Sequence, residues 1–161
     1  MTMEAAPKSV AKARRRLRDD LDASGVCRSV DDCVLLLSEL VTNAVEHAEG
    51  DGARLIHVNW WRVRTSLRID VHGPGAPEKV RPRRPPASDT RGRGLLLVNR
   101  IADAWAVAPS CHGGTMVSFL MYNAWKPDGT ARHSPGPTGC QLRAAPPPEA
   151  SPYRGGGVVR G

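Results

Sequence analysis

The sequence predicts an α+β fold class, a two-layer α/β sandwich in which helices cover one face of a mostly antiparallel sheet. Two amphipathic helical segments come first, at residues 7–23 and 30–48. Two β-rich segments, at residues 53–63 and 67–71, follow them as a hairpin. A loop, a third helix and two further strands complete the chain up to about residue 122. This order of elements, without an internal repeat, is typical of helices packed on one side of a sheet.

The first two helices are defined by their apolar spacing and by their ends. The first has apolar residues at intervals of three and four, namely Val10, Ala13, Leu17 and Leu21. Gly25 marks its end. The second begins after Ser29, which forms a capping-box-like start with Asp32 three positions later. Its core-facing stripe consists of Val34, Leu37, Val41, Ala44, Val45 and Ala48.

The later elements are separated by turn signals. The segment "HGPGAP" at residues 72–77 interrupts the second strand, because proline has no backbone donor and glycine favours unusual dihedral angles. A loop rich in proline and arginine occupies residues 78–91, and loops of this length are usually functional or disordered. The third helix begins just after the glycines at 92 and 94. The last two strands, at 105–109 and 115–122, flank a "CHGG" turn.

The 161 residues are enough for one domain, but their composition is not uniform. Regular apolar periodicity extends to about Tyr122, and from Asn123 onward proline, glycine and small residues dominate. Such a tail cannot bury enough apolar area to offset its ordering entropy. We therefore expect a flexible N-terminus at residues 1–6, a working domain at residues 7–122 and a disordered tail at residues 123–161.

The net charge of +7 comes almost entirely from arginine, with 19 arginines and 4 lysines against 16 acidic residues. A basic balance fits nucleic acid, an acidic partner or a phosphorylated ligand, and it also fits a simple solvated face. One cluster is "KARRRLR" near the start of the chain. The other consists of Lys79, Arg81, Arg83, Arg84, Arg91 and Arg93.

Signals for export and for metal binding are weak in this sequence. It contains no signal peptide and no apolar run of transmembrane length, so we expect a cytoplasmic location with reduced thiols. The four cysteines are at positions 27, 33, 111 and 140. They have no C-x-x-C spacing and no paired histidine ligands, which argues against a metal site.

A polar row accompanies the apolar stripe of the second helix. Glu39 and Asn43 are four residues apart, and His47 extends the row by one more turn. A carboxylate, a carboxamide and an imidazole in one row can face a shared cleft. On this helix alone, an exposed polar stripe explains the pattern equally well.

Three glycine pairs add a possible ligand for that cleft. They are Gly73 with Gly75, Gly92 with Gly94, and Gly113 with Gly114. A glycine pair that opens a helix offers backbone N–H groups and the positive end of the helix dipole, which suits phosphate. Arg91 and Arg93 beside that helix start favour an anion. An Asn side chain together with triphosphate oxygens is a suitable Mg²⁺ site, because this ion takes few protein ligands.

Four segments, in this order and at suitable spacing, match a known family. They are "ELVTNAVEHA", "GPGAP", "GRGLLLVNRIAD" and "GGTMVSF". Together they resemble the GHKL (Bergerat-fold) ATP-binding domain, and most closely the stand-alone anti-sigma-factor serine/threonine kinases of the actinobacterial type. The resemblance covers roughly residues 10–121. It implies ATP and Mg²⁺ as cofactors, and it implies a homodimer.

The resemblance also implies roles for residues on the phosphate side. Glu39 is similar to the general base that activates the attacking serine hydroxyl, and Asn43 to the residue that holds Mg²⁺ against the phosphates. His47 lies at the phosphate-side end of the same motif. Gly92, Arg93, Gly94 and Leu95 match the phosphate-binding turn, and Arg91 is the candidate for contacting the terminal phosphate. The loop at residues 78–91 corresponds to the ATP lid.

The adenine side departs from the family at one position. Gly73 and Gly75 match the glycines under the adenine, and Thr115 matches the threonine near it. The family's motif reads Asp-x-Gly-x-Gly, whereas this chain has "VHGPG", so Val71 stands where the family has an adenine-binding Asp. An unpaired buried amino group costs about 1–3 kcal/mol, which is roughly ten- to hundredfold in affinity. Asp70 is adjacent, but its side chain is expected on the opposite face of the strand.

Three functions are therefore compatible with the sequence. The first is an anti-sigma-type kinase that binds a sigma factor and phosphorylates an anti-anti-sigma (STAS-type) partner, as the resemblance implies. The second is a degenerate regulatory binding module that keeps the fold and binds ATP weakly or not at all. The third is a basic nucleic-acid-binding protein that uses its arginine-rich helix and loop. The intact pair of Glu39 and Asn43 favours the first, and Val71 favours the second.

Overall fold

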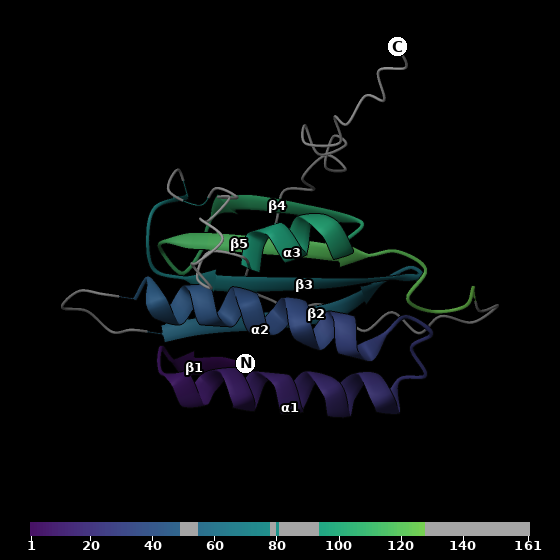
Figure 1. Cartoon of the computed structure of the whole chain (residues 1–161). Helices are drawn as coiled ribbons and strands as arrows, with labels where there is room; N and C mark the ends of the chain where they lie inside the picture. The colour runs from purple at the N-terminus through teal and green to yellow at the C-terminus, as the bar shows by residue number, and fades with distance from the viewer. Residues whose placement is uncertain (49–54, 78–79, 81–93, 128–161) are drawn as a thin grey trace, which may run out of the picture.

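The computed structural model describes residues 1–48, 55–77, 80 and 94–127. It has a five-stranded antiparallel sheet in the order β1-β2-β3-β5-β4. The elements are β1 (Thr2–Glu4), α1 (Pro7–Ala23), α2 (Val30–Glu46), β2 (Leu55–Val63), β3 (Ser66–Gly73), α3 (Gly94–Ile101), β4 (Ala104–Pro109) and β5 (Thr115–Met121). Figure 1 shows the three helices on one face of the sheet. The predicted α+β sandwich is thereby confirmed, and no helix among the described residues is long and apolar enough to cross a membrane.

Local sequence signals set where the first two helices begin. α1 has Pro7 at its first position, where the missing backbone N–H leaves no hydrogen bond unmade. Its bounds agree with the prediction. α2 is capped by Ser29, whose Oγ accepts a hydrogen bond from the backbone N–H of Asp32 at 3.1 Å. α2 ends at Glu46, two residues before the predicted end.

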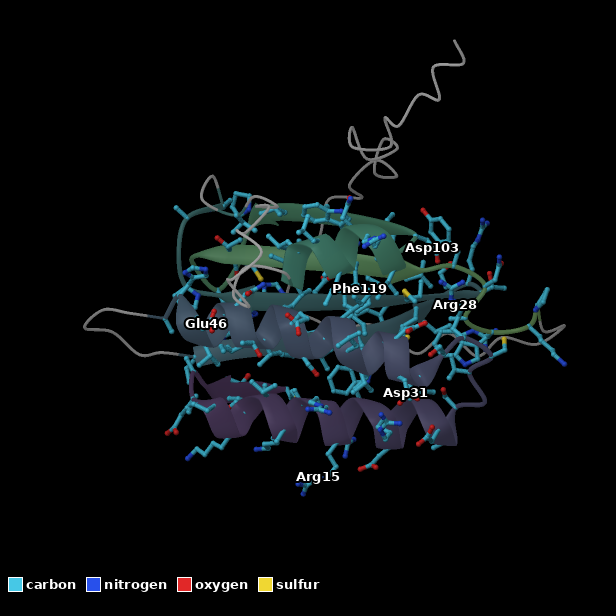
Figure 2. All side chains as sticks on the ribbon, in the orientation of Figure 1. Arg15, Arg28, Asp31, Glu46, Asp103 and Phe119 are labelled. Atoms are coloured by element: carbon cyan, nitrogen blue, oxygen red, sulfur yellow. The ribbon has the colours of Figure 1, made fainter. Side chains whose placement is uncertain are left out.

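The core lies between the helices and the adjacent face of the sheet. Cross-strand pairs Ile69–Phe119 and Leu67–Met121 are fully buried, and Figure 2 places Phe119 near the middle of the sheet. Two tryptophan side chains connect the helices to the strands. Trp60 Nε1 donates to Asp20 Oδ2 of α1 at 3.2 Å, and Trp105 Nε1 donates to Asn99 Oδ1 of α3 at 3.1 Å. Both tryptophans therefore hold a helix against the sheet.

Both predicted boundaries of the working domain need correction. The N-terminal residues expected to be flexible include β1, which pairs with β2, and Met3 of β1 is buried in the core. A strand of three residues is too short for its alternation to stand out in the sequence. At the other end, Ala124 and Trp125 lie beyond the predicted limit at residue 122 but are buried, and Trp125 Nε1 donates to the carbonyl of Ser24 at 3.1 Å.

The strand β3 also extends further than predicted. His72 and Gly73 belong to the "HGPGAP" segment that was expected to interrupt the ladder, yet they pair with Met116 and Thr115 of β5. The break comes only at Pro74, since glycine and histidine keep their backbone donors and proline does not. β3 therefore carries its regular alternation up to the edge of the glycine motif.

One end of the domain is held together by an ion pair between two connecting segments. Arg28, in the α1–α2 connection, lies 3.2 Å from Asp103, which follows α3. The same Asp103 oxygen accepts a hydrogen bond from the backbone N–H of Tyr122 at 2.6 Å. Figure 2 places Arg28 and Asp103 at one end of the domain and Glu46 at the other.

A buried ion pair lies on the face of the sheet turned away from the helices. Asp70 is 2% exposed, and both its carboxylate oxygens accept hydrogen bonds from Arg68, at 2.8 Å and 3.3 Å. Arg68 also lies over the ring of Trp61, its neighbour on β2. Burial raises the pKa of Asp70, and the guanidinium of Arg68 opposes that effect. Breaking such a pair by removing one partner leaves a buried charge and is strongly destabilising.

We predict that Arg68→Met lowers the free energy of unfolding by roughly 3 kcal/mol at pH 8. Without Arg68, the pKa of Asp70 rises further above its unfolded value. The loss of stability caused by the buried carboxylate is then complete above the folded-state pKa of Asp70. It declines as the pH falls from that pKa toward the unfolded-state pKa. Urea unfolding should therefore give a smaller loss at pH 5 than at pH 8. The control Arg68→Met with Asp70→Asn should remove this pH dependence, and an equal loss for the single variant at both pH values would contradict the explanation.

Candidate functional site

The polar row predicted on α2 reaches the first residue of α3. A Cβ added to Gly94 would lie 2.9 Å from Glu39 Oε2 and 3.0 Å from Asn43 Nδ2. The space that a side chain would occupy at Gly94 is thus bordered by the functional groups of both residues. Glycine at this position allows the carboxylate and the carboxamide to approach the N-terminus of α3, which is the positive end of the helix dipole.

Glu39 is partly buried, and its environment favours the protonated form. Burial raises the pKa of Glu39, and the nearby carboxylate of Glu46 raises it further. A carboxylate with a raised pKa is a stronger proton acceptor and is closer to the range in which a general base works near neutral pH. The direction of this shift is the one that the predicted role of Glu39 would need.

His47 lies at the end of the polar row predicted on α2. The last helical residue is Glu46, and His47 is the exposed C-cap, with its backbone N–H bonded to the carbonyl of Asn43 at 3.0 Å. This bond places the backbone of His47 one turn beyond Asn43, and its role beside a ligand stays a prediction. The row that the structure brings together consists of Glu39, Asn43 and Gly94.

The three residues predicted for the adenine side also come together. Thr115 Oγ1 donates a hydrogen bond to the carbonyl of Gly75 at 2.9 Å. A Cβ at Gly73 would lie 2.8 Å from Cβ of Ala44, so β3 and α2 approach each other more closely than any larger residue permits. Ala44 follows Asn43 directly, and α2 therefore connects the predicted adenine side with the predicted phosphate side.

The remaining predicted contacts can be placed only in part. Leu95 lies in the first turn of α3 and packs against the core. Arg91, Gly92 and Arg93 lie outside the described residues. The rest of the predicted lid also lies outside them, apart from Val80, and so does the basic cluster of Lys79, Arg81, Arg83, Arg84, Arg91 and Arg93.

Neither neighbour of Val71 on β3 turns a polar side chain to the same face of the sheet. It is 3% exposed and pairs with Val58 and Val117 on the helix-facing side of the sheet. Asp70 and His72 face the other side, where Asp70 pairs with Arg68, and Nδ1 of His72 lies 2.9 Å from Ser110 Oγ. The prediction that Asp70 cannot replace the missing acceptor is consistent with this alternation.

One group of candidate residues was missed by the sequence analysis. The ligand atoms of His72, Cys111 and His112 lie within 4.8 Å of one another, although the cysteines had argued against a metal site. Only Cys111 and His112 are adjacent in the sequence, in the "CHGG" turn. His72 joins them because the end of β3 lies beside the β4–β5 turn, a pairing that spacing alone does not reveal.

We predict that two neighbouring glycines of the β4–β5 turn differ in their tolerance of alanine. Both have positive φ, +82° for Gly113 and +78° for Gly114. A Cβ at Gly113 would meet nothing within 4 Å, whereas one at Gly114 would lie 2.4 Å from the carbonyl oxygen of Gly73. Gly113→Ala should cost about 1–2 kcal/mol for its left-handed backbone, and Gly114→Ala should cost roughly 1–3 kcal/mol more. Urea unfolding measures both, and equal losses would contradict the close approach.

The comparison with known protein families agrees with this fold. Residues 3–121 match the model of the histidine kinase-like ATPase domain. No curated protein matches the chain. The match covers well over half of the chain and includes the described residues of the site. The chain therefore belongs to the histidine kinase-like ATPase domain family.

Proposed function

We propose that this domain binds ATP with Mg²⁺ and transfers a phosphoryl group to a hydroxyl of a partner protein, as an anti-sigma-type serine/threonine kinase. The observation that carries the proposal is the placement of Glu39 and Asn43 around the missing side chain of Gly94. That space is polar, borders the N-terminus of α3 and lies in a domain of the histidine kinase-like ATPase family.

The donor set fits Mg²⁺ and phosphate. Asn43 offers a carboxamide oxygen, and a single protein ligand is enough for an ion that keeps several waters and binds phosphate oxygens. The first backbone N–H groups of an α-helix have no partner within the helix, so those of α3 could donate hydrogen bonds to a bound anion. Bound Mg²⁺ supplies charge neutralisation for the phosphates. Glu39 lies beside this position and would take the proton from the attacking hydroxyl.

Recognition of the base is the weaker part of the site. Gly73, Gly75 and Thr115 form its backbone-rich wall, but Val71 offers no acceptor for the amino group of adenine. This single position favours a second candidate function, a regulatory binding module with weak or no ATP binding. Both candidates share the fold and differ in the measured affinity for nucleotide.

The basic first helix supports a protein partner with an acidic surface. Arg14, Arg15, Arg16 and Arg18 are exposed on α1, and Figure 2 shows Arg15 pointing away from the domain. Beside α1 lies a groove of about 460 Å³ lined in part by Lys8, Lys12, Arg15 and Arg16. It is not lined by the candidate nucleotide residues. We propose that the sigma factor binds this surface and that the anti-anti-sigma protein binds the catalytic side. We also propose that the domain functions as a homodimer.

We predict measurable binding of Mg²⁺–ATP below millimolar concentration by calorimetric titration. Asn43→Ala should weaken binding at least tenfold in the presence of Mg²⁺, because the only proposed protein ligand of the ion is lost. Glu39→Gln should keep the affinity and lower ATP turnover by about 10²–10⁴-fold. Ser38→Ala is the matched control on α2, since its hydroxyl bonds to the carbonyl of Val34 and faces no proposed ligand.

Two results would contradict the kinase proposal. If the wild-type protein shows no binding at millimolar ATP, the regulatory binding module becomes the preferred function. If Glu39→Gln turns over ATP as fast as the wild type, Glu39 is not the base.

Restoring the missing acceptor gives a separate prediction. Val71→Asp should tighten ATP binding by about tenfold, because the adenine amino group gains a partner. The same variant should lower the stability of the nucleotide-free protein, since Val71 lies in the core and an unpaired carboxylate is costly there. Inosine triphosphate lacks the amino group of adenine and is therefore the control ligand for this comparison. An equal gain for both nucleotides, or no gain for ATP, would contradict the role of this position.

A further inference from the structure

Three side chains with metal-binding chemistry gather at the end of β3, on the face of the sheet turned away from the helices. His72 of β3 is buried, and Cys111 and His112 are exposed on the β4–β5 turn. One ligand atom from each residue lies within 4.8 Å of the other two. This group is separate from Glu39 and Asn43, which lie on the helix side of the sheet.

The turn that carries two of these residues is well ordered by its own hydrogen bonds. The backbone N–H of Ser110 donates to the carbonyl of Gly114 at 3.0 Å, and Gly113 N–H donates to the carbonyl of Ser110 at 3.1 Å. Ser110 Oγ accepts from the backbone N–H of His112 at 3.0 Å and lies 2.9 Å from Nδ1 of His72. One hydroxyl therefore connects the turn to the third member of the group, which is the kind of outer contact that orients ligands in metal sites.

A further histidine supports the exposed part of the group. His57 is the cross-strand neighbour of His72, and its ring stacks on His112 with centroids 3.8 Å apart. Thr2 Oγ1 lies 3.0 Å from Nδ1 of His57 and forms a polar contact with the edge of that ring. Stacking limits the rotation of His112 and keeps its imidazole near Cys111 and His72.

Two neighbouring imidazoles, those of His72 and His57, have lowered pKa values. Burial, together with the nearby His112, His57 and Arg68, lowers the pKa of His72 to about 4. Burial also lowers the pKa of His57. A lowered pKa favours the neutral imidazole, which is the ligand form of histidine.

We propose that His72, Cys111 and His112 bind one transition-metal ion of the Zn²⁺ class, with the fourth coordination position open. A tetrahedral Zn²⁺ site with these ligands needs donor atoms roughly 3.3–3.6 Å apart, so a small adjustment of exposed side chains completes it. Two imidazoles and one thiolate select borderline and soft ions over Mg²⁺, which prefers oxygen. On binding, the Cys111 S–H bond breaks, the sulfur–metal bond forms, and the proton passes to the buffer.

The site would connect two parts of the sheet that border the candidate nucleotide residues. His72 immediately precedes Gly73, and Cys111 and His112 lie in the turn that leads to Thr115. A metal ion held by all three would fix the β4–β5 turn against the end of β3. We therefore expect occupancy to raise the unfolding temperature of the domain.

The test uses the full chain, stripped with EDTA and kept reduced, and titrated with Zn²⁺ and with Co²⁺. We expect one equivalent of Zn²⁺ per chain and, with Co²⁺, the charge-transfer absorption of a cobalt–thiolate bond. Changes to outer contacts of metal sites alone cost about 10–100-fold. Cys111→Ser and His112→Gln remove ligands, so each should weaken Zn²⁺ binding by at least about 100-fold and abolish the Zn²⁺-induced rise in unfolding temperature.

Matched controls decide between this site and unspecific thiol or imidazole binding. Cys27→Ser removes an exposed thiol that contacts Ala124, and His47→Gln removes an exposed imidazole at the end of α2. Both should bind Zn²⁺ like the wild type. Because Cys111 and His112 are exposed turn residues, their variants should fold, which far-ultraviolet circular dichroism checks. Absence of a one-equivalent site, a cobalt–thiolate band that survives in Cys111→Ser, or its loss in Cys27→Ser would overturn the proposal.

Discussion

The arrangement of this domain depends on the close approach of three backbones at Gly73. On one side, the position where a Cβ would stand is 2.8 Å from Cβ of Ala44 on α2. On the other side, the carbonyl oxygen of Gly73 lies next to Gly114 in the β4–β5 turn. A side chain at either glycine would separate the elements. Because the contact is this close, α2 presents Asn43 and Glu39 to α3, and the β4–β5 turn presents Thr115 and Ser110 to the end of β3.

The alternation of β3 divides the chemistry of the domain between the two faces of one sheet. Ile69, Val71 and Gly73 face the helices, and they build the core and the wall of the candidate nucleotide site. The even-numbered residues Arg68, Asp70 and His72 face away from the helices and carry the polar groups. This arrangement explains why the two polar residues that flank Val71 offer no acceptor on the helix side of β3. Moving them to the helix side would require a register shift that exposes Ile69.

Much of the fold could be predicted because its signals are local. Each of these signals involves only a few neighbouring residues. Examples are the Ser29 cap, the spacing of Leu17 and Leu21, and the glycines around the helix starts. Glu39 and Asn43 could be paired for the same reason, since they share one helix face. Other features depend on contacts between distant segments. They are the strand β1, the burial of Trp125 and the grouping of His72 with Cys111. Periodicity carries no information about such contacts, and the predicted end of α2 was two residues too far along because helix ends are weakly marked.

The ion pair between Arg28 and Asp103 gives the domain a fixed end. Asp103 follows α3 closely and is held by Arg28 and by the backbone of Tyr122, whereas the other end of α3 begins at Gly94. α3 has 8 residues and is therefore about 12 Å long. If it rotates about its held C-terminal end by roughly 10°, its N-terminus moves by about 2 Å, comparable to the length of a metal–oxygen bond. A rotation of this kind would move Gly94 further than the residues of α3 that lie near Asp103.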